Sequence, residues 1–133
     1  FYSNYYNIMV HEIFHLFTFG LSASTDTNPL KLNLGEYNGG YSYTTNNKGV
    51  YNVLTSNVVY NANNSAFLTT YSKSNFNEDV SDNMSLIVML ANKRDFLEKG
   101  TMIYNKVRYI SKVYQDKYST LATWQRLSWL KFI

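Results

Sequence analysis

The sequence predicts a mainly α fold in a single domain that spans residues 1–133. Apolar residues recur at helical spacing near 4–19, 77–92 and 101–131, and polar residues that can cap a helix precede these stretches. The segment 21–75 is instead rich in Ser, Thr, Asn and Gly. With 133 residues, of which 45% are hydrophobic, the chain can bury a substantial core.

The first helix is predicted over residues 4–19. Ser3 or Asn4 can cap its start, and Gly20 suits a C-terminal position just beyond its last turn. Apolar residues lie nearly all round this helix, so we expect it to be buried on most sides.

Segment 21–75 is predicted to be a long irregular excursion with one or two short strands or a short helix. Gly39-Gly40 is a turn signal, and the stretches 41–45 and 50–60 contain Tyr, Val and Thr, which favour strands. A connection of this length is unusual in a compact domain. It is therefore either a functional loop or a surface elaboration.

The second helix is predicted over 77–92, where Asn75 or Asn77 can serve as the cap. The C-terminal helices are predicted as one over 101–117 and a shorter one after Thr120. The helix over 101–117 has an apolar stripe on one side. Its solvated side is expected to carry three basic residues, Lys106, Arg108 and Lys112.

Both histidines of the chain stand in one motif, His11-Glu12-Ile13-Phe14-His15. On a helix they lie four residues apart on the same face, so both imidazoles can bind one zinc ion. Glu12, between them, is placed to activate a water molecule on that zinc. The motif predicts a zinc hydrolase. The alternative is a pair of core histidines held by hydrogen bonds inside a helical domain.

A catalytic zinc site needs three protein ligands and an open position. The chain has no cysteine and no third histidine, so the third ligand must be a carboxylate. The best candidate lies in the cluster 77–82, because Glu78 and Asp82 share one helix face. Glu78 can bind the metal while Asp82 accepts a hydrogen bond from the far nitrogen of a ligand histidine. The alternative is that these carboxylates only complement the dipole of their helix.

The cluster 77–82 resembles the N-E-x-x-S-D pattern of thermolysin-like gluzincins, in which the Glu is a zinc ligand and the Asp orients a ligand histidine. The 63 residues from His15 to Glu78 are far more than that group has. The order of motifs is more similar to zinc metallopeptidase lipoproteins of bacterial nutrient-import systems. It is also similar to the catalytic domain of anthrax lethal factor and its relatives, which have a Tyr where this chain has Tyr71. Both of these groups carry Glu in place of Asp82.

These resemblances imply zincin-like catalytic helices, a long irregular loop and a C-terminal helical subdomain. Zinc bound by His11, His15 and Glu78 would cleave a peptide or protein substrate, with Glu12 as general base and Tyr71 at the oxyanion. They also imply an extracellular or cell-envelope location, with surface or lipoprotein attachment through a missing N-terminus. An upstream sheet would make the fold α+β. The alternative is a non-catalytic zinc-binding or surface interaction domain.

Charge and hydropathy exclude other classes. The net charge is +3, but ten of the twelve Lys and Arg residues lie from Lys73 onward, where solvated helix faces explain them. We therefore expect no nucleic-acid partner. No run approaches the roughly 18 apolar residues of a transmembrane helix. The absence of cysteine excludes disulfides and thiolate ligands.

Overall fold

The computed structural model describes residues 5–22, 27–43, 66–89 and 98–118. Within these ranges the elements are α1 (Tyr5–Gly20), α2 (Pro29–Asn33), η2 (Leu34–Tyr37), η4 (Tyr71–Lys73), α3 (Phe76–Met89) and α4 (Met102–Lys117), where η denotes a 3-10 helix. This described part contains helices and no strand, so the predicted mainly α class is confirmed. None of its helices is long and apolar enough to cross a membrane.

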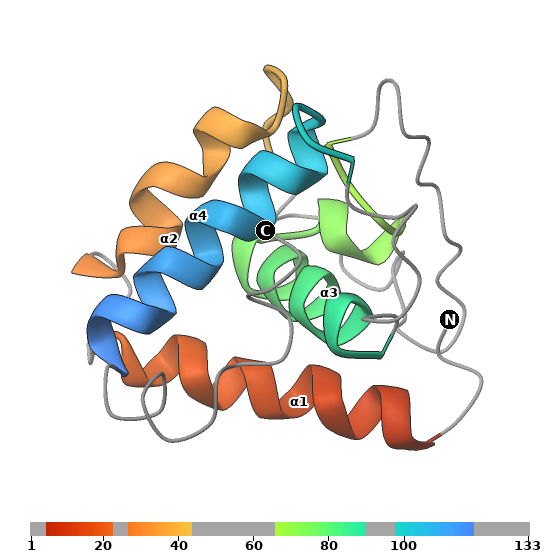
Figure 1. The fold of residues 1–133 in the computed structure, drawn as a ribbon, viewed down its shortest axis with the longest axis vertical. Coiled ribbons are helices and arrows are strands. Elements are labelled where there is room, and N and C mark those ends of the chain that lie inside the picture. The colour runs from red at the N-terminus through yellow and green to blue at the C-terminus, as the bar shows by residue number, and fades with distance from the viewer. Residues whose placement is uncertain (1–4, 23–26, 44–65, 90–97, 119–133) are drawn as a thin grey trace.

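Helix α1 packs against α3, while α4 lies beside α2 and η2 and also contacts α3 (Figure 1). The surfaces that meet are apolar. Their fully buried members are Leu30, Leu34, Leu68, Val80, Met84, Ile103, Val107 and Ile110. Burial of this shared core is what holds α1 and α3 side by side, although they are far apart in the sequence.

Helix α1 is buried on one face only, so the expectation of burial on most sides is wrong. Val10 and Phe14 belong to the core, whereas Leu16 is 71% exposed and Phe19 is 63% exposed. The exposed α1 face consists of Tyr5, Tyr6, Met9, Ile13, Leu16 and Phe19. Among the described residues, nothing covers enough of this face to bury these side chains.

Gly20 is the last residue of α1, but it does not have the positive φ of a left-handed helix cap. A Cβ atom at this position would overlap the hydroxyl of Tyr118, which follows α4. That hydroxyl donates a hydrogen bond of 2.7 Å to the carbonyl of Phe17. Close approach of α4 to α1 therefore explains the glycine.

Segment 21–75 supplies the expected short helix as α2. The Oδ1 atom of Asn28 caps it by accepting from the backbone N–H of Leu30 at 2.9 Å, and Pro29 occupies the first helical position. The Nδ2 atom of Asn28 also donates to the carbonyl of Thr18 at 3.0 Å. One asparagine thus both starts α2 and attaches it to the end of α1.

The predicted turn at Gly39 and Gly40 is present, with φ angles of 59° and 87°. Residues 41–43 form no strand. The rest of the predicted strand stretches falls in 44–65, which lies outside the described residues.

Two caps explain where the later helices begin. The Oδ1 atom of Asn75 accepts from the backbone N–H of Asn77 at 2.9 Å and of Glu78 at 3.1 Å, so Asn75 and not Asn77 is the cap of α3. The hydroxyl of Thr101 accepts from the N–H of Tyr104 at 3.2 Å and caps α4. The end of the predicted second helix beyond residue 89 and the short last helix lie outside the described residues.

The predicted solvated side of α4 is wrong at one position. Arg108 and Lys112 are exposed, but Lys106 is fully buried. A lysine without access to water needs hydrogen-bond partners and a counter-charge. Its partners lie next to the candidate site described below.

Candidate metal centre

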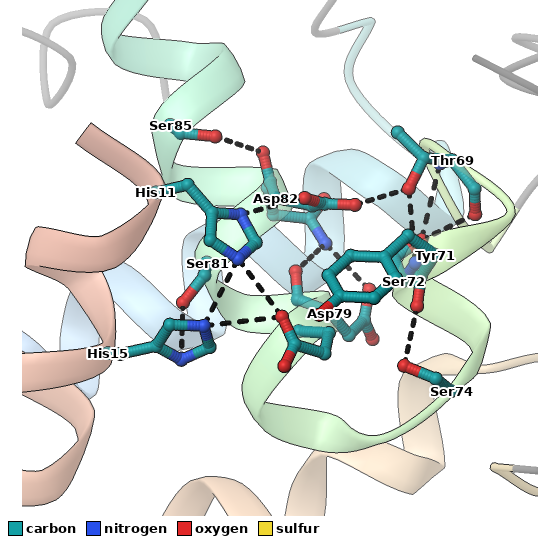
Figure 2. Close-up of polar contacts among 12 residues, drawn as sticks. His11, His15, Thr69, Tyr71, Ser72, Ser74, Asp79, Ser81, Asp82 and Ser85 are labelled. Carbon is teal, nitrogen blue, oxygen red and sulfur yellow. Dashed lines mark hydrogen bonds and ion pairs between the residues drawn. The ribbon is translucent and has the colours of Figure 1, made fainter. Parts of the chain in front are cut away.

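His11 and His15 project from the same side of α1 toward α3 (Figure 2). Their Nε2 atoms lie 3.1 Å apart, and their rings meet edge-on with centroids 4.8 Å apart. His11 is fully buried and His15 is partly buried. The four-residue spacing therefore directs two imidazole nitrogens to one point, as a helix requires.

Glu78 adds a third group from the first turn of α3. Its Oε2 atom lies 3.0 Å from Nε2 of His11 and 3.2 Å from Nε2 of His15. Asn75 already caps the helix by accepting a hydrogen bond from the backbone N–H of Glu78. The Glu78 side chain therefore has no capping role, and it faces α1. The structure thus brings together the three residues that the sequence predicts as metal ligands.

The three atoms form a nearly equilateral triangle with edges of 3.0, 3.1 and 3.2 Å. For zinc bonds of about 2.0–2.1 Å, tetrahedral ligands lie roughly 3.3–3.4 Å apart, so the triangle fits this ion closely. Hydrogen bonds alone satisfy such a triangle poorly. If both Nε2 atoms donate to Glu78, their N–H groups face each other, and if one Nε2 donates to the other, a nitrogen lone pair faces the carboxylate. One cation bound by all three atoms satisfies them together.

The electrostatics agree with this donor set. Burial by itself would raise the pKa of Glu78, but hydrogen bonds and charges from His11 and His15 dominate and lower the pKa to about 2. Burial also acts to lower the pKa of His15, but the hydrogen bond and charge of Glu78 outweigh it and raise the pKa. An ionised carboxylate thus lies against two imidazoles, which is the ligand set of many catalytic zinc sites.

Asp82 lies on the Nδ1 side of His11, one helical turn after Glu78 on α3 (Figure 2). Its buried Oδ1 atom lies 2.9 Å from Nδ1 of His11, and the described residues give it no hydrogen bond of good geometry. Its Oδ2 atom accepts a hydrogen bond from the hydroxyl of Thr69. A carboxylate at Nδ1 keeps the proton on that nitrogen and leaves the lone pair of Nε2 for a metal. Asp82 therefore lies next to Nδ1 of His11, although its side chain is shorter than Glu, and its role in orienting the imidazole stays a prediction.

Ser81 lies next to the far nitrogen of His15, a contact that the sequence motifs did not predict. Its Oγ atom lies 3.1 Å from Nδ1 of His15. Ser81 is three residues after Glu78, so the i, i+3 spacing on α3 is a signal that could have indicated it. Thr69 is also missed. No spacing rule connects it with Asp82, because only the tertiary fold brings the segment before η4 to α3.

Glu12 borders the triangle but is not part of it. One ligand atom from each of His11, Glu12 and His15 lies within 4.8 Å of the other two. Glu78 lies much closer, at 3.0 Å and 3.2 Å from the two Nε2 atoms. Glu12 is also exposed. It would therefore lie beside a metal held by the triangle and stay open to solvent, while Glu78 is the better third ligand.

Tyr71, in η4, lies to the right of the two imidazoles in Figure 2. Its ring centroid is 6.0 Å from that of His11. Burial, together with the charge and hydrogen bond of Glu78, raises the pKa of Tyr71 to about 12. The hydroxyl therefore keeps its proton at neutral pH and can act as a hydrogen-bond donor.

An open groove of about 740 Å³ runs along the site. Glu12, His15 and Glu78 line it together with apolar side chains from the exposed α1 face and from the start of α3. Its other lining residues are Met9, Ile13, Leu16, Phe19, Lys31, Asn75, Phe76 and Asn77. The groove therefore gives an extended ligand access to the triangle along an apolar wall.

Comparisons with known proteins identify no relative. No family model, no curated protein and no solved structure matches the chain. The resemblance to gluzincins thus stays a prediction that rests on the short motifs named above.

Proposed function

We propose that this protein is a zinc-dependent peptidase whose metal is bound by His11, His15 and Glu78. The observation that carries the proposal is the triangle of two imidazole nitrogens and one carboxylate oxygen, with edges of 3.0–3.2 Å. The contacts of Asp82 and Ser81 with the far imidazole nitrogens support it, because such contacts orient metal-binding histidines.

Zinc bound in such a site would supply a water molecule of lowered pKa and a Lewis acid for a carbonyl oxygen. Glu12 then serves as the general base, since it is exposed at the edge of the site and adjacent to both histidines. Its carboxylate accepts a proton from the water that attacks the peptide carbonyl. It later delivers that proton to the leaving amine, so that hydrolysis yields one carboxylic acid and one amine.

Tyr71 supplies a hydrogen-bond donor for the carbonyl oxygen, where negative charge develops during the reaction. Its raised pKa of about 12 suits this role, because the hydroxyl is protonated over the whole neutral range. Glu12 lines the groove, whereas Tyr71 contacts Glu78, so the two residues approach the metal centre from different elements.

The second candidate function is a zinc-binding interaction domain without catalysis. The observation that favours it is the exposed α1 face, where Tyr5 is 91% exposed and Leu16 is 71% exposed. Apolar side chains grouped in this way are typical of surfaces that bind another protein. Ligands and base would look the same in such a domain, so only an activity measurement separates the two functions.

Glu12→Gln tests the catalytic proposal. We expect this variant to retain zinc but to lose activity by about 10²–10⁴-fold, because the amide cannot accept the water's proton. The assay incubates zinc-loaded protein with a peptide library and detects new termini by mass spectrometry. Glu36→Gln, a substitution of an exposed glutamate in η2, is the matched control and should cleave like the parent. If the parent binds zinc and cleaves nothing, the interaction domain is the better account.

A further inference from the structure

Lys106 is the largest fully buried side chain among the described residues, and the proposed chemistry does not use it. Its ammonium group lies 2.8 Å from Oδ2 of Asp79 and donates a hydrogen bond to the carbonyl of Ala66. It also lies 4.1 Å from the centre of the Phe67 ring, where a cation–π contact is favourable. One cation from α4 therefore holds two separate segments of the chain.

Both segments carry residues of the candidate metal centre. Asp79 directly follows Glu78 on α3, and Ala66 begins the segment that carries Thr69 and Tyr71. Thr69 is in turn the donor to Asp82, the carboxylate behind His11. The ammonium of Lys106 thus joins the segment that carries Glu78 and Asp82 to the segment that carries Tyr71.

The carboxylate of Asp79 is fully satisfied by neighbours from three parts of the chain. Besides Lys106, Oδ2 accepts from the hydroxyl of Tyr43 at 2.6 Å and Oδ1 accepts from Nδ2 of Asn83 at 2.8 Å. Each of these bonds has a preferred direction, so together they leave the first turn of α3 little freedom to rotate. Rotation of that turn would move the Glu78 carboxylate away from the two imidazoles.

Stability alone does not account for this pair. Burial lowers the pKa of Lys106 and raises the pKa of Asp79, because both charged groups have lost their water. The loss of hydration offsets much of the attraction between two buried charges, and an apolar pair of the same shape often stabilises a fold equally well. What apolar side chains cannot supply is a fixed set of directional bonds.

We propose that Lys106 and Asp79 are positioning residues of the metal centre, which fix Glu78 and the segment 66–72 in the geometry that binds the metal. This inference rests on the proposed metal site. The pair would set the metal affinity and the ligand geometry of that site, in addition to any contribution to folding.

The test uses cobalt in place of zinc, because the visible absorption of cobalt reports the number and geometry of its ligands. The decisive variant is the double substitution Asp79→Asn with Lys106→Met, which removes both charges and leaves neither buried alone. We expect cobalt binding about 10- to 100-fold weaker than in the parent, with a changed absorption spectrum. Tyr43→Phe removes one donor and no charge, and should give a smaller loss in the same direction.

Two controls separate positioning from folding. Lys112→Met removes an exposed lysine from the same helix and should leave affinity and spectrum unchanged. Ile110→Val trims a fully buried core residue of α4, so it should lower the melting temperature but leave the cobalt spectrum of the folded protein unchanged. Circular dichroism shows at each temperature which variants are folded.

Parent-like cobalt affinity and spectrum in both the double variant and Tyr43→Phe would overturn the positioning role while leaving the metal site intact. A parent protein that binds no cobalt would instead refute the metal site itself, and the positioning role with it. The positioning role requires that the folded double variant binds cobalt more weakly and with a changed absorption spectrum. It also requires that the spectrum of Ile110→Val is unchanged.

Discussion

At the scale of single residues, the two histidines differ in what holds their far nitrogens. Nδ1 of His11 faces the buried carboxylate of Asp82 at 2.9 Å, whereas Nδ1 of His15 faces the hydroxyl of Ser81 at 3.1 Å. A carboxylate makes the opposite nitrogen a more basic ligand than a hydroxyl does. His11 is therefore expected to be the stronger of the two ligands.

Asp82→Asn tests this assignment. Burial raises the pKa of Asp82 well above its ordinary value, and a metal on His11 would favour the ionised carboxylate again. The amide keeps the size of the side chain but cannot ionise, so we expect zinc affinity to fall by about 10- to 100-fold. The measurement is competition for zinc against a chromophoric chelator at fixed pH. Asp116→Asn, at an exposed position of α4, should leave the affinity unchanged. Equal affinities for the parent and Asp82→Asn would show that Asp82 does not support His11.

The sequence indicates the ligand residues because the alternatives are so few. With two histidines and no cysteine in the chain, a third ligand beside His11 and His15 must be a carboxylate, and spacing on a helix selects Glu78. The burial of Lys106 is not predictable in this way. Lys106 stands near Arg108 and Lys112 with nothing in the local pattern to distinguish it, and only the packing of α4 against Asp79 makes it a core residue.

At the scale of elements, α1 carries both histidines, so whatever fixes α1 also fixes the site. Phe14 lies between them in the sequence, is only 4% exposed, and stacks on Tyr114 of α4 with centroids 6.1 Å apart. The hydroxyl of Tyr114 also bonds to Thr18 at 2.8 Å. Helix α4 therefore anchors the C-terminal half of α1, while α3 supplies the ligand that faces both histidines.

Phe14→Ala is expected to destabilise the fold by about 3–5 kcal/mol, because it leaves a cavity between α1 and α4. Leu16→Ala, two residues away on the exposed α1 face, should change stability by less than about 0.5 kcal/mol. Urea unfolding followed by circular dichroism measures both. Similar losses in the two variants would mean that the exposed α1 face is covered in the native protein.

Helix type and position are largely predictable here, whereas helix environment is not. Periodicity and caps locate α1, α3 and α4 to within a few residues of their described bounds. The apolar residues all round α1 could not show which face meets the core, because both faces are similarly hydrophobic. Gly20 likewise looks like a left-handed cap in the sequence, but the contact that requires it comes from Tyr118, almost a hundred positions later.

At the scale of the whole molecule, a metal bound by His11, His15 and Glu78 would link α1 to α3 directly. Without that link, their packing depends on the apolar core and on contacts such as those of Ser81 and Asp82. A ligand that binds only the folded state stabilises it in proportion to the logarithm of its concentration over its dissociation constant. Metal binding and folding are therefore expected to be coupled.

Chelation should consequently lower the melting temperature. At zinc concentrations 100 times the dissociation constant, the metal adds about 2.7 kcal/mol, which corresponds to a shift of roughly 5 °C or more for a domain of this size. Scanning calorimetry before and after treatment with EDTA measures the difference. Glu12→Gln should show the same shift, because it keeps all three ligands. An EDTA-insensitive melting temperature would argue against a metal that bridges the two helices.

The zinc content of the purified protein after dialysis tests the proposed metal centre most sharply. Elemental analysis measures it for the parent and for Glu78→Ala. Glu36→Ala serves as the control, since Glu36 is exposed in η2 and outside the site. The proposed centre predicts one zinc per chain in the parent and in Glu36→Ala, and a loss of most of that zinc in Glu78→Ala. A parent that holds no zinc, or a Glu78→Ala variant that holds as much as the parent, would contradict it.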